Sequence, residues 1–140
     1  EIIKSFEEIS EKVFSFNFDK DAYQEKINNS IEIIYGLRNF IGNANKYSKN
    51  NIFITLSGDI NFTKLLIEDD GNGLSKEILN KIGQPYLKNL DEDKSGLGLG
   101  IFIGKTLLEK NYAKLKFDNS KKYGGAKIEI IWKNLDLKKI

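Results

Sequence analysis

Apolar and polar residues follow two periodicities along this chain, one typical of strands and one typical of helices. Alternation, as in VFSFNF, predicts five strands, over residues 13–18, 51–57, 62–69, 113–117 and 126–132. Helical spacing predicts a helix from Ile31 to about Lys49, whose apolar stripe of Ile31, Ile34, Leu37, Ile41 and Ala44 packs on a sheet. A second helix is predicted over 97–111.

Turn and cap residues divide these elements. Ser30 and Ser75 stand where N-caps are needed, the second before a short helix that ends at about Ile82. Residues 58–61 and 119–125 are rich in turn formers and predict two hairpins. The order of elements shows no βαβ rhythm. It predicts an α+β two-layer sandwich, with a mixed, largely antiparallel sheet covered on one face by about three helices.

Length and composition indicate one domain, at residues 13–133. With 140 residues, 40% of them hydrophobic, the chain can bury a core of its own. Residues 1–12 are charged and weakly amphipathic, so we expect the remnant of a helical linker there and a C-terminal tail at 134–140. Because the sequence has no methionine, we expect it to be a piece of a longer protein.

Charge and residue types exclude several classes of function. A net charge of +2 from 22 basic and 20 acidic residues lacks the lopsided field of a nucleic-acid binder. No apolar run is long enough to insert into a membrane. The chain has neither cysteine nor histidine, so its chemistry must use oxygen ligands and amides.

A first candidate motif lies on the helix predicted from Ile31. Asn39, Asn43 and either Lys46 or Tyr47 share one helix face. Asparagine is a poor helix former, whereas its carbonyl oxygen suits Mg²⁺, a lysine can contact phosphate and a tyrosine ring can flank a base. A solvated polar face in an asparagine-rich chain is the alternative.

A second motif, Asp69-Asp-Gly71-Asn-Gly73, follows a predicted strand. A carboxylate at that strand end can accept a hydrogen bond from an adenine amine, while the glycines permit close backbone approach. The alternative is a tight turn that leads into the Ser75 cap. An EF-hand loop is excluded because no acidic residue stands at position twelve counted from Asp69.

A third motif, Ser95-Gly96-Leu97-Gly98-Leu99-Gly100, opens a predicted helix. Unpaired N–H groups and the helix dipole there can bind a triphosphate. The motif lacks the Lys-Ser/Thr of a P-loop and the surrounding βαβ unit of a dinucleotide site. As an alternative, Gly100 and Gly104 allow close helix packing.

Together the three motifs resemble the N box and the two glycine boxes of the ATP-binding catalytic domain of sensor histidine kinases, within the GHKL superfamily and its Bergerat fold. The sequences of three shorter segments are similar to those of the RegB/PrrB group of redox-responsive kinases. These segments are residues 35–37, 83–86 and 98–109. Two departures from the family pattern are Lys94, where many relatives have glycine, and Ala126, near where threonine is frequent.

The resemblance implies Mg-ATP as cofactor, with Asn43 and Asn39 as metal ligands and Asn39 and Lys46 as catalytic residues. It also implies a lid at residues 84–94. The implied nucleotide-binding residues are Asn39, Asn43, Lys46, Tyr47, Asp69, Gly71, Gly73, Leu74, Ser95, Gly96, Leu97, Gly98 and Leu99.

Asn39 bears on the reaction type. Family members that hydrolyse ATP or phosphorylate serine resemble one another in having a glutamate base at this position, and an amide cannot remove a proton. A histidine attacks with its own lone pair, so positioning and charge neutralisation suffice. The sequence therefore favours transfer of the γ-phosphoryl group to a histidine over ATP hydrolysis.

The resemblance implies partners and a location as well. The phosphoacceptor histidine would lie on a dimerisation domain of the same protein, with a response regulator downstream. We expect a cytoplasmic domain whose parent protein is attached to the cell inner membrane. The alternatives are a GHKL-type ATPase or serine kinase such as an anti-sigma factor, and a non-catalytic docking module.

Overall fold

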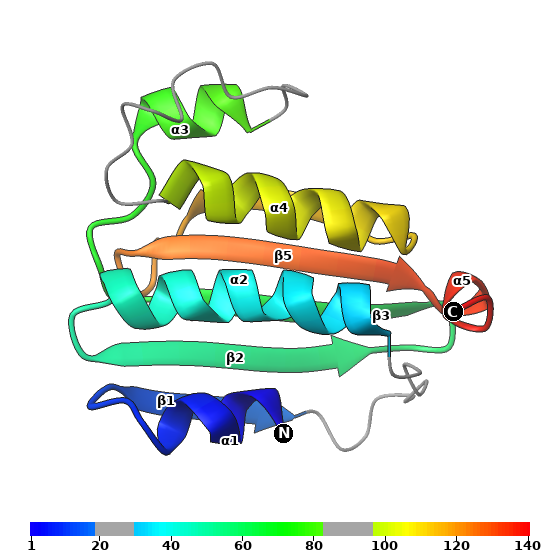
Figure 1. The fold of residues 1–140 in the computed structure, drawn as a ribbon, viewed down its shortest axis with the longest axis horizontal. Helices are drawn as coiled ribbons and strands as arrows, with labels where there is room; N and C mark the ends of the chain where they lie inside the picture. The colour runs from blue at the N-terminus through cyan, green and yellow to red at the C-terminus, as the bar shows by residue number, and fades with distance from the viewer. Residues whose placement is uncertain (19–29, 83–96) are drawn as a thin grey trace.

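The computed structural model describes residues 1–18, 30–82 and 97–140. One layer is a five-stranded sheet in the order β1-β2-β3-β5-β4 (Figure 1). Its strands are β1 (Val13–Phe18), β2 (Asn51–Gly58), β3 (Phe62–Asp69), β4 (Lys114–Asn119) and β5 (Ala126–Lys133). The helices are α1 (Ile2–Glu7), α2 (Ile31–Tyr47), α3 (Lys76–Lys81), α4 (Leu97–Lys110) and α5 (Asn134–Leu137).

Strand pairing is mixed and largely antiparallel, as the order of elements predicts. β2 and β3 form one antiparallel hairpin, and β4 and β5 form the other. β1 is an edge strand that pairs in parallel with β2, with Val13 opposite Asn51. The connection from β1 through α2 to β2 is therefore a βαβ unit, so the expectation of an element order without one is wrong here. The alternation in β1 predicts a strand, but it does not encode the direction in which that strand pairs.

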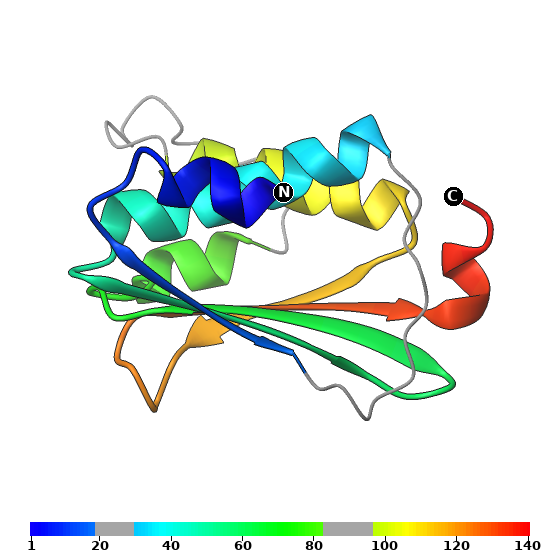
Figure 2. The ribbon, with the colours of Figure 1, turned by 90° about the horizontal axis from the view of Figure 1, so that it is seen from below.

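The helices α1, α2 and α4 lie on one face of the sheet (Figure 2), which confirms the α+β two-layer prediction. Both predicted N-caps form, since the Ser30 hydroxyl accepts from the Ile33 N–H and the Ser75 hydroxyl accepts from the Ile78 N–H. α2 ends at Tyr47, before the expected Lys49, because Ser48 already has extended backbone. Among the described residues no helix is long and apolar enough to cross a bilayer.

Glycines set the contact between α2 and α4. A Cβ added at Gly104 would lie 2.7 Å from Cζ of Phe40, and one at Gly36 would lie 2.9 Å from Cγ of Leu108. The alternative reading of Gly104 as a packing residue is therefore correct. Because α4 covers a second facet of α2, burial departs from the predicted stripe: Ile33 and Phe40 are buried, whereas Ile31 is 75% exposed.

The last residues of the chain pack against the sheet. The buried Asn134 donates from Nδ2 to the carbonyls of Asp59 and Ile60 and accepts from the Thr63 hydroxyl at 2.7 Å. Leu137, on α5, is only 1% exposed. The expected tail at 134–140 thus includes a short helix that closes the end of the β2–β3 hairpin.

Asp70 fastens the end of β3 to the turn between α2 and β2. Its carboxylate accepts from the backbone N–H of Lys49 at 2.8 Å, of Asn50 at 3.1 Å and of Asn51 at 3.1 Å, and from Nδ2 of Asn51 at 3.0 Å. Desolvation opposes ionisation, but these bonds outweigh it and lower the pKa of Asp70 to about 2. The strand end that carries Asp69 is thereby fixed to the end of α2.

Two glycine-to-alanine changes should have opposite effects on stability. Gly104→Ala forces a methyl group against the Phe40 ring and should lower the free energy of unfolding by about 1 to 3 kcal/mol. Gly42→Ala adds a methyl group 3.8 Å from Phe6 and should stabilise α2 by about 0.5 to 1 kcal/mol. Urea denaturation of the two variants and the wild type measures both effects, and equal stability of Gly104→Ala and the wild type would contradict the packing.

Acid should weaken the fold through Asp70. Its pKa is lower in the folded protein than the ordinary value of 3.8, so its stabilising contribution is present above that value and is lost as the pH falls toward about 2. We expect the melting temperature of the wild type to fall more steeply over this range than that of Asp70→Asn, which should be less stable near neutral pH. Parallel curves for the two proteins would contradict the role of this carboxylate.

Candidate functional site

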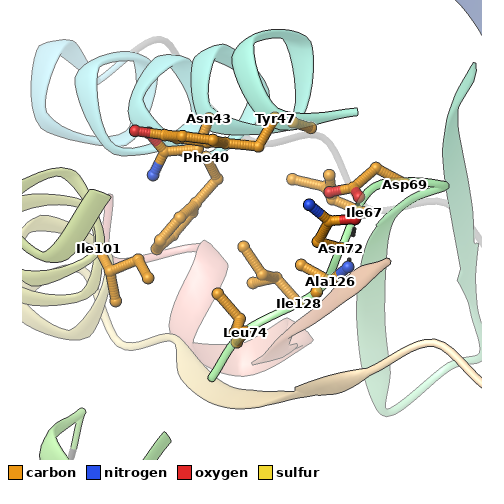
Figure 3. Close-up of a pocket in the computed structure, with 12 residues that line it drawn as sticks. Phe40, Asn43, Tyr47, Ile67, Asp69, Asn72, Leu74, Ile101, Ala126 and Ile128 are labelled. Carbon is orange, nitrogen blue, oxygen red and sulfur yellow. Dashed lines mark hydrogen bonds between the residues drawn. The ribbon is translucent and has the colours of Figure 1, made fainter. Parts of the chain in front are cut away.

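A cavity of about 90 Å³ opens between α2, α4 and the ends of β3 and β5. Side chains from all four elements point into it (Figure 3). Its lining is mainly apolar, with Asp69, Asn43 and Asn72 among the few polar groups. The lining residues are Phe40, Asn43, Ala44, Tyr47, Ile67, Asp69, Asn72, Gly73, Leu74, Ile101, Ala126 and Ile128.

Asp69 is the fixed polar group of this cavity. Only 5% of the residue is exposed, and its Oδ1 accepts from the N–H of Gly71 at 2.8 Å and of Ala126 at 3.3 Å. Desolvation by burial raises the pKa of Asp69, and these two N–H groups partly offset the effect. Within the described residues both bonds to this side chain use Oδ1, which leaves Oδ2 for a ligand.

Glycines allow the backbone to come this close to Asp69. A Cβ at Gly125 would lie 2.0 Å from Oδ1 of Asp69, and a Cβ at Gly71 would lie 2.2 Å from the carbonyl oxygen of Tyr47. The N–H of Gly125 also donates to the carbonyl of Asp69 at 3.0 Å. Gly125 lies in the β4–β5 turn and was not among the predicted site residues, because its sequence signal resembles that of any turn.

The β4–β5 turn is anchored so that Gly125 and Ala126 reach Asp69. The ring of Tyr123 stacks on Phe53 of β2 with centroids 3.6 Å apart. The Ser120 hydroxyl donates to Glu68 of β3 at 2.7 Å and accepts from the Tyr123 N–H at 3.0 Å. Residues on neighbouring strands therefore hold the turn in register with the end of β3.

Asn119 holds the segment that carries Gly73 and Leu74, two residues that line the cavity. Its Oδ1 accepts from the N–H of Leu74 at 2.6 Å, and its Nδ2 donates to the carbonyl of Leu74 at 3.0 Å. Gly73 has φ +79°, and a Cβ there would lie 2.6 Å from Oδ1 of Asn119. Gly73, the second glycine of the DDGNG motif, is thus required both by its positive φ and by its contact with Asn119. The sequence predicted Gly73 as a site residue, but it did not predict the contact with Asn119.

Asn43 faces α4 from the other wall. A Cβ at Gly100 would lie 3.0 Å from Nδ2 of Asn43, which is buried and has no hydrogen-bond partner among residues 1–18, 30–82 and 97–140. Its Oδ1 would lie 3.2 Å from the same Cβ, so the whole amide group of Asn43 faces Gly100. Asn39 lies one turn earlier and outside the cavity lining, with Nδ2 donating to the carbonyl of Tyr35 at 2.9 Å.

The last turn of α2 carries the other two predicted residues. Tyr47 lines the cavity, whereas the exposed Lys46 does not and lies with Nζ 5.3 Å from the Tyr47 ring centre. The two residues are adjacent, so the helix turns only one of them toward the cavity.

The third motif is described from Leu97 onward, where α4 begins. Gly98 is buried and Leu99 is 46% exposed, while Ile101 lines the cavity beside Asn43. Ser95, Gly96 and the predicted lid at residues 84–94 lie outside the described residues. The structure thus brings together Asn43, Tyr47, Asp69, Gly73 and Leu74 around one cavity, with the start of α4 at its side.

Sequence reasoning missed most of the apolar wall. Phe40, Ile67, Ile101 and Ile128 line the cavity. Their patterns predict only burial, because a residue in the core and a residue in a pocket wall have the same periodicity.

Solved structures with the same fold include two histidine kinase domains. The catalytic domain of the histidine kinase ThkA superimposes with a TM-score of 0.76 and 21% identity, over 95% of this chain and 88% of that chain. The mycobacterial sensor histidine kinase MprB gives a TM-score of 0.72 with 22% identity, over 94% and 91% of the two chains. At these identities the likeness concerns the fold.

Sequence relatives are longer proteins. The sensor histidine kinase RegB of Cereibacter sphaeroides is 33% identical over 130 residues, an alignment that covers 80% of this chain and 28% of the relative. The heme sensor protein HssS of Staphylococcus saprophyticus is 34% identical over 89 residues, which covers 62% of this chain and 19% of the relative. The chain therefore matches less than a third of the length of these relatives.

A family comparison covers most of the chain. Residues 28–136, which include all three motifs and every wall of the cavity, match the family described as histidine kinase-, DNA gyrase B-, and HSP90-like ATPases. The chain belongs to this ATPase family.

Proposed function

We propose that this chain is the ATP-binding catalytic domain of a sensor histidine kinase. It would bind Mg-ATP and transfer the γ-phosphoryl group to a histidine on a dimerisation domain of the same protein, which would pass it to a response regulator. Family membership and the likeness to RegB support the proposal. The observation that carries it is the buried, backbone-fixed Asp69 in an apolar cavity.

Adenine suits the polar and apolar parts of the cavity. The ionised Asp69 is an acceptor whose Oδ2 is not used by the N–H of Gly71 or of Ala126, and it would take a hydrogen bond from the exocyclic amine of the base. The side chains of Ile67, Leu74 and Ile128 would cover the base, and Tyr47 would flank it. Guanine has a carbonyl oxygen where adenine has its amine, so Asp69 would repel it.

The residues beside the cavity fit a magnesium ion bound through phosphate. Among the described residues no three acidic side chains cluster to hold a metal by themselves. Asn43 lines the cavity, so its carbonyl oxygen can serve as one ligand, with Asn39 one turn away as a second. Bound there, Mg²⁺ would neutralise charge on the phosphates.

Phosphate would lie at the start of α4. The first turn of a helix carries a partial positive charge, which favours phosphate. Leu97, Gly98 and Leu99 form this turn, and the preceding Ser95 and Gly96 complete the motif. Lys46, at the end of α2, would add a cation for the same phosphates.

The reaction type follows from Asn39. Its amide donates to the Tyr35 carbonyl and cannot act as a base toward water or a serine hydroxyl. A histidine acceptor needs no such base, since its neutral imidazole attacks directly. ATP turnover by the isolated domain would instead favour the ATPase alternative.

The wider setting of the domain belongs to the same proposal. We propose that the domain lies on the cytoplasmic side, in a parent protein at the cell inner membrane that responds to redox conditions; the likeness to RegB supports this proposal. Residues 13–133 would form the catalytic domain and residues 1–12 its link to the dimerisation domain.

Binding of adenine nucleotide tests the role of Asp69. Isothermal calorimetry with Mg-ADP should give saturable 1:1 binding for the wild type and no binding with Mg-GDP. Asp69→Asn should cost about 1 to 3 kcal/mol of binding free energy, because an amide donor would face the adenine amine. Binding by the wild type should also weaken as acid protonates Asp69. Because the pKa of Asp69 is raised, this weakening should begin at a higher pH than for an ordinary aspartate. Full ADP affinity in Asp69→Asn would contradict the assignment.

Magnesium dependence tests Asn43. The wild type should bind ADP more tightly with Mg²⁺ than with EDTA, and Asn43→Ala should lose about 1 to 2 kcal/mol of that gain because one ligand to the ion is missing. Adenosine, which has no phosphate, is the control ligand and should bind both proteins equally. An unchanged magnesium effect in Asn43→Ala would exclude it as a ligand.

A further inference from the structure

Residues 10–12, which precede β1, are hydrogen-bonded to the C-terminal end of α2. Lys12, just before β1, donates from Nζ to the carbonyl of Ser48 and, at 3.1 Å, to that of Lys49. Its own N–H donates to the Ser10 hydroxyl at 3.0 Å, and that hydroxyl donates to Oδ1 of Asn45 on α2. Ser10 and Lys12 thus form one unit bonded to the last turn of this helix.

That end of α2 forms part of the base pocket. Tyr47 lines the cavity, and its carbonyl oxygen lies so close to Gly71 that a Cβ there would be 2.2 Å away. Gly71 in turn donates to Oδ1 of Asp69. A shift of the α2 end would therefore be transmitted through two direct contacts to the carboxylate.

The charge on Lys12 acts in two ways. A cation at a helix C-terminus stabilises the carbonyl groups that lack intrahelical partners. Lys12 also favours the ionised form of Asp69, since it lowers the pKa of that carboxyl against the larger opposing effect of desolvation. Among the described residues, the charged groups that shift the pKa of Asp69 are Asp70, which raises it, and Lys12, which lowers it.

We infer that Lys12 is a positioning residue for nucleotide binding: its ammonium holds the last turn of α2 against the Asp69–Gly71 corner, although it does not line the cavity itself. This inference rests on the proposed function. It ties the affinity for nucleotide to the segment that precedes the domain, and a displacement of residues 10–12 would loosen the pocket.

Three variants and the wild type test the inference by ADP calorimetry over a range of pH. Lys12→Met keeps the aliphatic stem and removes the charge, so it should bind ADP about tenfold more weakly. Lys12→Arg keeps a cation and should restore affinity to within about threefold. Lys4→Met makes the same change at an exposed residue of α1 and should bind as the wild type does.

The pH profile separates positioning from a loss of stability. In Lys12→Met, the pH at which acid abolishes binding should be higher than in the wild type, because Asp69 has lost a favourable cation, whereas Lys12→Arg should keep the wild-type profile. Equal affinity of Lys12→Met and the wild type, or equal weakening in both Lys12 variants with unchanged profiles, would overturn the inference. If the wild type bound no adenine nucleotide, the proposed function itself would fail.

Discussion

The site depends on the way in which one buried carboxylate is held. Asp69 accepts from the backbone N–H of Gly71 and of Ala126, and its own carbonyl accepts from Gly125. A buried carboxylate loses the solvation of water, which raises its pKa, and donors that cannot move away replace part of that solvation. The two segments that supply these donors are far apart in the sequence and must meet at the end of β3.

Much of the surrounding architecture makes that meeting possible. Asp70 fixes the α2–β2 turn to the end of β3, and Tyr123 fixes the β4–β5 turn to β2. Glycines at 71 and 125 remove the side chains that would collide with Asp69 and Tyr47. The same backbone conformation at Gly71 and Gly125 therefore serves both the fold and the proposed binding of adenine.

The sequence predicted the elements and the principal polar residues well because their signals are local. Strand alternation, the two serine caps and the hairpin turns depend on neighbouring residues, and the strands were found within two residues of the predicted bounds. The chemistry of the motifs suggested the roles proposed for Asp69 and Asn43, and the family resemblance assigned them. The pairing of β1 with β2 and the exposure of Ile31 were not predictable in this way, since both depend on what lies beside each element in space.

The parts of the site that sequence reasoning missed share this non-local origin. Asn119 bonds to Leu74, 45 positions earlier in the chain, and Gly125 bonds to Asp69, 56 positions earlier. In the sequence alone, both resemble ordinary turn residues. Lys12 is one of many lysines in the sequence, and its bonds to the carbonyls that follow α2 distinguish it from the others. Contacts of this kind become visible when the fold is known.

The most direct test of the account is nuclear magnetic resonance of the ¹⁵N-labelled domain titrated with Mg-ADP and with Mg-GDP. If Asp69 binds the adenine amine, the amides of Gly71, Gly125 and Ala126 should shift strongly with the first nucleotide and hardly with the second. Equal shifts with both nucleotides, or shifts confined to residues away from the end of β3, would contradict the central claim.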